Sequence, residues 1–208
     1  MDQAFWDAVS IFFDELRARD GFIPEHICFV LESRPVKLIN APLTELLISF
    51  DGDGDGDGLI TGDLFPTTLT SVTFCYIYCL DPKIDLSGHS SLKSILFMDT
   101  IDKTLDGSRL PQKLTCLLLG RGFDQTVINL PPRLTELVAP RIGQVYDNHQ
   151  SSNNLRRLAL VDITRNGLTV ITPINFPMLE DLTFRLIEVG HYSSSSYHWS
   201  NHITSSWN

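Results

Sequence analysis

The sequence of residues 110–119 is Leu-Pro-Gln-Lys-Leu-Thr-Cys-Leu-Leu-Leu, and that of residues 130–139 is Leu-Pro-Pro-Arg-Leu-Thr-Glu-Leu-Val-Ala. Both stretches contain the pattern Leu-x-x-apolar-x-apolar, whose first leucine (Leu114 and Leu134) we call the anchor. The two apolar residues that end the pattern are two positions apart, so they point to the same face of a β-strand. Proline has no backbone N–H to donate, so the proline three residues before each anchor belongs to the turn that enters the strand. Each stretch is therefore expected to form a turn followed by a short strand.

The same pattern occurs seven times along the chain. The anchors are Leu43, Leu69, Leu92, Leu114, Leu134, Leu155 and Leu179. Successive anchors are 26, 23, 22, 20, 21 and 24 residues apart, and threonine directly follows four of them. One short strand cannot bury an apolar face alone, whereas stacked repeats form a continuous core. We therefore expect a solenoid with seven parallel strands on one face, whose connecting segments are too rich in Gly, Pro, Asp and Asn for long helices.

This pattern is similar to that of leucine-rich repeats, which implies an α/β horseshoe with short parallel strands on one face and a mostly irregular convex side. The common leucine-rich repeat also carries Asn or Cys eight residues after its anchor. The residues at that position here are Asp51, Ile77, Thr100, Gly122, Ile142, Ile163 and Ile187. The asparagine ladder is missing, so the repeats are irregular.

Residues 110–137 resemble the FNIP repeat, a leucine-rich-repeat subclass in which Leu-Pro-x-x-Leu-x-x-Leu is followed by Phe-Asn-Gln. The second element here is Phe123-Asp124-Gln125, with Asp in place of Asn. The resemblance covers the two repeats quoted above, and the other loops lack the Phe-Asn-Gln element. It implies a solenoid fold and a binding role, and it provides no catalytic residues.

Three segments are expected along the chain: an N-terminal cap (1–38), seven irregular repeats (39–189) and a Ser-rich tail (190–208). Apolar residues between Phe5 and Leu16 have helical spacing, which predicts one amphipathic helix that covers the first repeat. The alternative for this helix is an F-box-like module, as FNIP-repeat proteins often carry one. Residues 23–30 resemble a decayed repeat strand, and the low aliphatic content of the tail predicts a loose segment outside the core.

Composition and charge limit the function classes. The 208-residue chain is 43% hydrophobic and 20% charged, as in an ordinary globular protein. Its formal net charge is −9, so we expect no nucleic-acid partner. We expect no membrane segment, because neither a signal-peptide pattern nor a membrane-spanning apolar run is present. The four cysteines lie mostly in apolar strings, so we expect them to be buried, reduced thiols. Reduced cysteines are typical of a cytoplasmic or nuclear protein, which is the location we expect. The four cysteines are Cys28, Cys75, Cys79 and Cys116.

The sequence contains no Gly-rich phosphate loop, no Cys-x-x-Cys metal spacing and no Gly-x-Ser-x-Gly elbow. His198 and His202 are four residues apart in the tail, but no Cys or carboxylate completes a metal-ligand set there. We therefore expect a non-enzymatic protein–protein interaction module without a catalytic cofactor. Two alternatives stay open, a substrate-recruiting adaptor of F-box type in ubiquitination and calcium-dependent binding.

The calcium alternative rests on the alternating Asp-Gly run of residues 51–58. Asp53, Asp55 and Asp57 match the first positions of an EF-hand loop and could supply three carboxylates to Ca²⁺. The twelfth position of that loop is Leu64 rather than glutamate. The other interpretation is an acidic insertion in a surface loop, in keeping with the 26-residue anchor spacing there, the longest in the array.

The strand pattern also predicts where a partner binds. If the positions three and five after each anchor point inward, those two, four and six after it face out. The middle outward row is Leu47, Thr73, Leu96, Leu118, Val138, Ala159 and Thr183. An apolar row of this kind on a monomer is typical of an interface, unless a loop covers it. We expect partner contacts from Leu47, Leu96, Met98, Leu118, Glu136, Val138 and Arg157.

Overall fold

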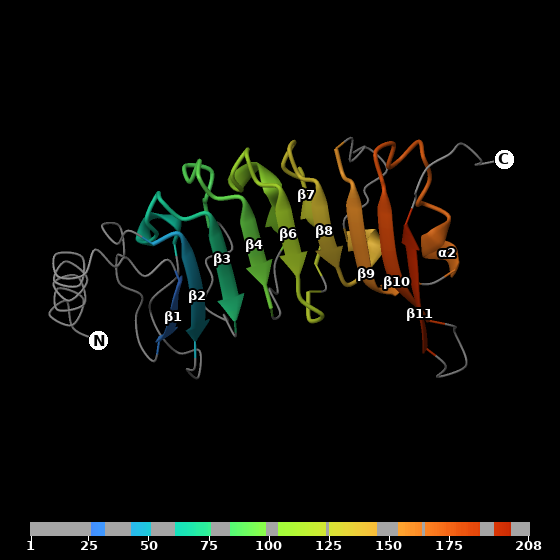
Figure 1. The fold of residues 1–208 in the computed structure, drawn as a ribbon, viewed down its shortest axis with the longest axis horizontal. Coiled ribbons are helices and arrows are strands. Elements are labelled where there is room, and N and C mark those ends of the chain that lie inside the picture. The colour runs from blue at the N-terminus through green and yellow to red at the C-terminus, as the bar shows by residue number, and fades with distance from the viewer. Residues whose placement is uncertain are drawn as a thin grey trace, which may run out of the picture.

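The computed structural model describes residues 26–31, 43–50, 61–75, 84–98, 104–123, 125–144, 154–163, 165–187 and 194–200 (Figure 1). Three of the sequence predictions lie outside these residues: the N-terminal helix with its capping role, the F-box-like alternative, and the Asp-Gly run with Asp53, Asp55 and Asp57. The predicted repeats lie mostly within them.

The described chain forms a parallel-strand β-solenoid with little helix. Its main sheet has nine strands in the order β1-β2-β3-β4-β6-β8-β9-β10-β11. The strands are β1 (His26–Leu31), β2 (Glu45–Phe50), β3 (Ser71–Cys75), β4 (Ser94–Phe97), β6 (Cys116–Leu119), β8 (Glu136–Ala139), β9 (Arg157–Ile163), β10 (Asp181–Ile187) and β11 (Ser194–Ser200). The first eight run parallel to their neighbours. All seven strands predicted from the anchors are present, and β1 is the decayed eighth.

The register of the sheet aligns the repeats position by position. Residues three after the anchor pair across all seven strands, from Leu46 through Leu117 to Leu182. These residues and those five after the anchor point into the core, and all except Phe184 are buried. Phe74 and Phe97 stack in this core with ring centroids 5.1 Å apart. The predicted inward register is therefore confirmed, as burial of this row drives the stacking.

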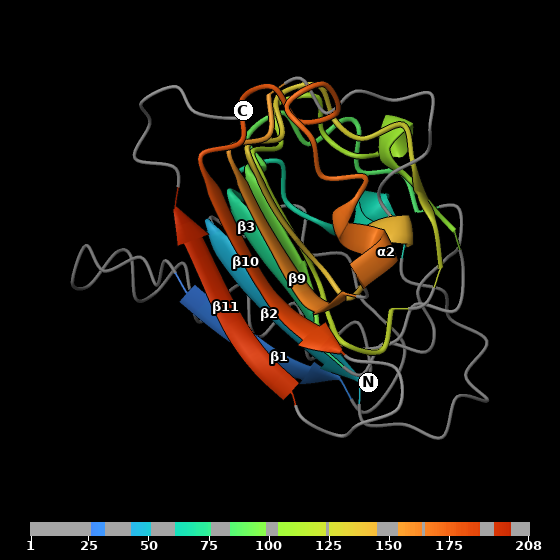
Figure 2. The same cartoon turned by 90° about the vertical axis from the view of Figure 1, so that its right-hand side faces the viewer.

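The connecting segments return over the opposite side of the sheet (Figure 2). They contain a two-stranded sheet of β5 (Leu105–Asp106) and β7 (Val127–Ile128), and short helical turns. These turns are η1 (Gly62–Leu64), η2 (Gly107–Arg109), η3 (Ile142–Gln144) and α2 (Arg165–Leu168). Phe123, the aromatic residue of the FNIP-like element, is buried there at 1% exposure. As expected, the described segments on this side contain no long helix.

Asp106 fixes one of these returning turns. Its carboxylate accepts a hydrogen bond from the Ser108 backbone N–H (3.0 Å) and another from Asn129 Nδ2 (3.2 Å). These bonds favour the ionised form, so they hold the pKa of Asp106 below its ordinary value. Asn129 belongs to the next repeat, so one side chain joins two turns of the solenoid.

The Ser-rich tail differs from the prediction of a loose segment. Its residues Ser194–Ser200 form β11, which pairs antiparallel with β10 along all seven residues of that strand. A polar segment can add to a sheet because backbone N–H and C=O groups make the ladder, whatever the side chains. The prediction is therefore wrong for these residues, since aliphatic content reports on burial rather than on strand pairing.

Candidate binding surface

The outward face of the main sheet carries the predicted apolar row, which we define as Leu47, Leu96, Leu118 and Val138. The sheet register places Leu96 beside Leu118, and Leu118 beside Val138. Leu47 is separated from them by Thr73. Each of the four apolar side chains is partly exposed, whereas the inward-pointing residues on either side of each along its strand are buried. No loop of the described chain buries the row.

Met98 widens the apolar row at the end of β4. Its side chain is 51% exposed, as an outward position predicts. The Cys75 thiol lies 3.1 Å from the Met98 sulfur and is itself buried. Pro140, in the same outward row six after the anchor, is also buried. The prediction of a uniformly outward flanking row is thus wrong, because Cys75 and Pro140 are buried whereas Met98 is exposed.

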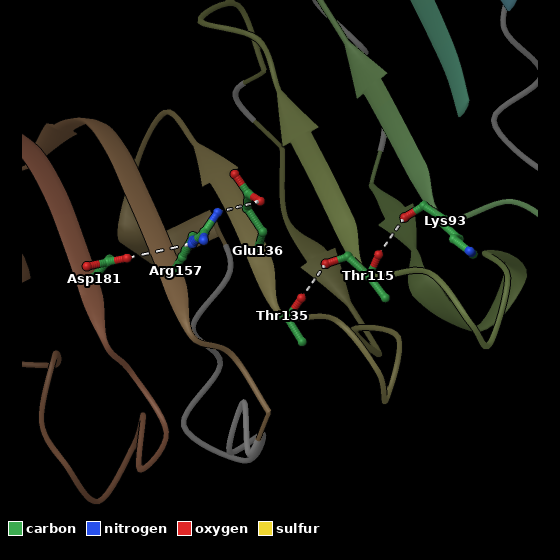
Figure 3. Close-up of polar contacts among 6 residues, drawn as sticks. All are labelled: Lys93, Thr115, Thr135, Glu136, Arg157 and Asp181. Atoms are coloured by element: carbon green, nitrogen blue, oxygen red, sulfur yellow. Dashed lines mark hydrogen bonds and ion pairs between the residues drawn. The ribbon is translucent and has the colours of Figure 1, made fainter. Parts of the chain in front are cut away.

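The row two positions after each anchor is polar and differs along the sheet. Arg157 lies between Glu136 and Asp181, with nitrogen–oxygen distances of 3.8 Å and 3.6 Å (Figure 3). The structure therefore pairs two predicted contact residues, Glu136 and Arg157, with each other. All three side chains are 40% exposed or more, and exposed pairs contribute little stability. A partner can replace these ion pairs at small cost.

The same row is uncharged over β3, β4 and β6, where it consists of Ser71, Ser94 and Cys116. Cys116 is half-buried, and burial, followed by the charge of Glu136, raises the pKa of its thiol. The thiol therefore keeps its proton at neutral pH. This part of the face offers only small uncharged groups beside the apolar row.

A ladder of hydrogen bonds joins the entries of the strands. The carbonyl that follows each anchor accepts two backbone N–H groups of the next repeat, as Thr115 accepts from Thr135 and Glu136, both at 2.9 Å. The Thr135 hydroxyl also donates to the Thr115 carbonyl (3.1 Å), and the Thr115 hydroxyl donates to the Lys93 carbonyl (3.2 Å; Figure 3). The threonine repeated after the anchor therefore adds a side-chain bond at a carbonyl that the sheet already uses. These hydrogen bonds hold the strand entries in line along one edge of the outward face.

Three exposed cations lie along this edge, and the sequence analysis did not select them. We call Lys93, Lys113 and Arg133 the entry rim. Lys113 and Arg133 directly precede their anchors in the turns into β6 and β8, and Lys93 directly follows the anchor before β4. Within the described chain none of the three has an ion pair. The signal was in the sequence, because the Leu-Pro-x-x-Leu repeats place a cation at the same position twice.

Arg121 and Arg141 repeat in a similar way at the other end of these strands. Each follows its anchor by seven residues, and both side chains are exposed. The β6 and β8 repeats are thus bounded by cations at both ends. The chain has a net charge of −9, so the ends of these two repeats carry charge of the opposite sign to the chain as a whole.

Another exposed apolar group lies away from the face. Ile174 and Met178, in the turn between α2 and β10, are 85% and 44% exposed. They were not selected from the sequence, where nothing distinguishes them from the turn residues of a buried segment. Ile174 is therefore an exposed apolar residue outside the apolar row.

His89 is the buried polar side chain of the described core, at 7% exposure. It lies three residues before its anchor, where other repeats have proline. Its Nε2 donates to the Gly62 carbonyl of the preceding repeat (2.9 Å), and its Nδ1 has no partner. The ring packs against Phe65. His89 thus joins two repeats on the returning side and does not contribute to the outward face.

Metal and membrane features were sought in the described part of the chain. No group of three or more His, Cys, Asp or Glu side chains there could hold a metal ion. No helix in that part is long and apolar enough to cross a membrane. The predicted calcium ligands are not among these residues.

Comparison of the chain with protein-family models, with curated proteins and with solved structures gives no match. The outward face is therefore the feature of the molecule that indicates a function.

Proposed function

We propose that this chain is a non-enzymatic interaction module, an irregular leucine-rich-repeat horseshoe of FNIP type whose strand face binds another protein. One observation carries the proposal: the apolar row is partly exposed on a sheet whose inward rows are buried. Apolar side chains gathered in a row on a surface favour association, because contact removes them from water.

The surroundings of the row have the composition of a protein interface. An apolar centre (Leu96, Leu118, Val138 and Met98) lies between a polar row and charged edges. Interfaces of moderate stability have such a centre and a polar rim, and a few central apolar side chains supply most of the affinity. Reduced cysteines fit a cytoplasmic or nuclear location, and neither Cys75 nor Cys116 forms a disulfide within the described chain.

Affinity capture with matched variants tests this function. The full chain is immobilised and incubated with a lysate of the cells that express it, and bound proteins are identified by mass spectrometry. The variant Leu118→Asp places a charge in the apolar row, and Ile174→Asp makes the same change at a side chain that is 85% exposed outside it. A partner retained by Ile174→Asp and lost by Leu118→Asp is then purified and its affinity measured.

The expected result is a loss of affinity of at least about tenfold for Leu118→Asp and less than about twofold for Ile174→Asp, as for a central interface residue and a residue outside it. A partner that binds both variants equally well would show that the strand face is not the binding surface.

A further inference from the structure

The entry rim and the apolar row together indicate the chemistry of the partner. We infer that the partner is a peptide segment of a protein in which apolar side chains lie beside acidic ones, the acidic groups pairing with Lys93, Lys113 and Arg133. This inference rests on the proposed function and adds to it the charge of the bound segment.

The first step is the charge of the three consecutive units that centre on β4. The turns and strands of residues 66–75, 89–98 and 110–120 contain no aspartate or glutamate. Their charged residues are Lys93 and Lys113, both exposed, and the next unit adds Arg133. Glu136 in that unit faces Arg157. Within these three units the charged side chains are therefore all cationic, although the chain as a whole is acidic.

The second step is distance. Lys113 lies in the turn before β6, so the five steps from Lys113 to Leu118 span at most about 16 Å. An extended segment of about five residues that lies along a strand therefore reaches from the entry rim to the apolar row. Because Lys93, Lys113 and Arg133 lie at the entries of the adjacent strands β4, β6 and β8, and neighbouring strands lie about 4.8 Å apart, their charges act together on one such segment.

The third step is the choice between a peptide and a nucleic acid. Nucleic-acid surfaces use aromatic side chains on which bases stack, and many cations that neutralise phosphates. The outward positions two and four after the anchor contain no aromatic residue, and Glu45, Glu136 and Asp181 lie among them. With a net charge of −9, the chain repels a polyanion at long range. A short segment with a few carboxylates meets only the local cations.

The test uses short random peptides displayed on phage and selected on the full chain. Selected peptides are synthesised with a fluorescent label, and their affinity is measured by anisotropy. We expect an excess of Asp and Glu over Lys and Arg relative to the unselected library, and an affinity that falls as ionic strength rises.

Two paired variants separate charge from structure. Lys113→Glu with Arg133→Glu should lower the affinity by about tenfold, because two exposed attractions become repulsions. Lys113→Arg with Arg133→Lys keeps both charges and should change it by less than about twofold. Both pairs are exposed, so urea unfolding should show wild-type stability for each.

Three outcomes would overturn the inference. Peptides without an acidic excess that lose binding in Leu118→Asp would leave the proposed function intact and remove the charge prediction. A failure to select any peptide would overturn the inference of a peptide segment, whereas the proposed function is contradicted only by the affinity capture. A short oligouridylate that binds more tightly than the selected peptides, and is lost in the Lys113→Glu and Arg133→Glu pair, would assign the entry rim to nucleic acid.

Discussion

The central repeats around β4, β6 and β8 and the C-terminal repeats of β9 and β10 share one framework and differ in their outward face. In both regions the residue three after the anchor is buried and pairs in register with its neighbours. In the centre the outward positions are Leu96, Leu118 and Val138, and the strand entries carry unpaired cations. In the C-terminal region they are Ala159 and Thr183, and the charges pair with one another, as Arg156 does with Glu180.

This difference shows that the inward and outward positions of one strand meet different requirements. Inward positions must be apolar in every repeat, because each repeat supplies part of a shared core. Outward positions contribute little to that core, so their chemistry varies from repeat to repeat. The C-terminal face satisfies its own charges, whereas the central face presents apolar and cationic groups that a partner can use.

The largest effect should come from the shared framework. Leu117→Ala in the centre and Leu158→Ala in the C-terminal region remove side chains that are 0% and 1% exposed. Each should lower the free energy of unfolding by about 2–5 kcal/mol, measured with urea. The outward variant Leu118→Ala should cost less than either, about 1 kcal/mol, since its side chain is partly exposed. Equal losses for Leu117→Ala and Leu118→Ala would contradict the division into core and face.

A smaller effect compares two glycines. A Cβ atom at Gly107 would overlap the backbone carbonyl of Asn129, which cannot move without shifting the next repeat. At Gly167 the nearest atom would be Ile163 Cγ1 at 2.9 Å, the movable part of a side chain. Gly107→Ala should therefore cost about 1–3 kcal/mol, and Gly167→Ala less. Thermal unfolding of the two variants measures the difference, and the reverse order would show that the central turns are not the tighter ones.

The hydroxyl bonds of the threonines that follow the anchors should each contribute about 1 kcal/mol to the free energy of unfolding. Thr135→Val removes the hydroxyl bond to the Thr115 carbonyl (3.1 Å) and keeps the shape of the side chain. Thr73→Val is the matched control, because Thr73 lies on the outward face of the described chain with no such bond. Urea unfolding should show a loss for Thr135→Val alone. A similar loss in both variants would mean that the ladder adds nothing to stability.

The smallest effect belongs to the C-terminal face. Arg157→Gln removes the contacts with Glu136 and Asp181, but the Arg157 side chain is 65% exposed. We expect a loss below about 0.5 kcal/mol, which disappears at high salt because exposed ion pairs are screened. Stability measured at two ionic strengths checks this. A larger loss that salt does not change would give these pairs a structural role.

The sequence was sufficient to predict the array, because anchor spacing and inward alternation are direct consequences of a shared core. The seven strands and the outward position of Leu118 are confirmed. Three features depend on other physics. Strand β11 forms by backbone pairing, which composition does not report. Cys75, the last residue of β3, is buried and its thiol contacts the Met98 sulfur of the next repeat, which strand alternation does not predict. The entry rim could be identified only from the register of the sheet. Lys93 and Lys113 occupy different positions of the repeat, and the stacked strands bring them to one edge.

Urea unfolding of the double variant Leu118→Asp with Val138→Asp tests most directly whether the apolar row is a surface. If the row faces solvent, two aspartates there leave a cooperatively folded chain with a midpoint close to that of the wild type. If the row is part of the core, two unpaired buried charges abolish cooperative unfolding. We predict the first result, and the second would contradict the binding surface on which the account depends.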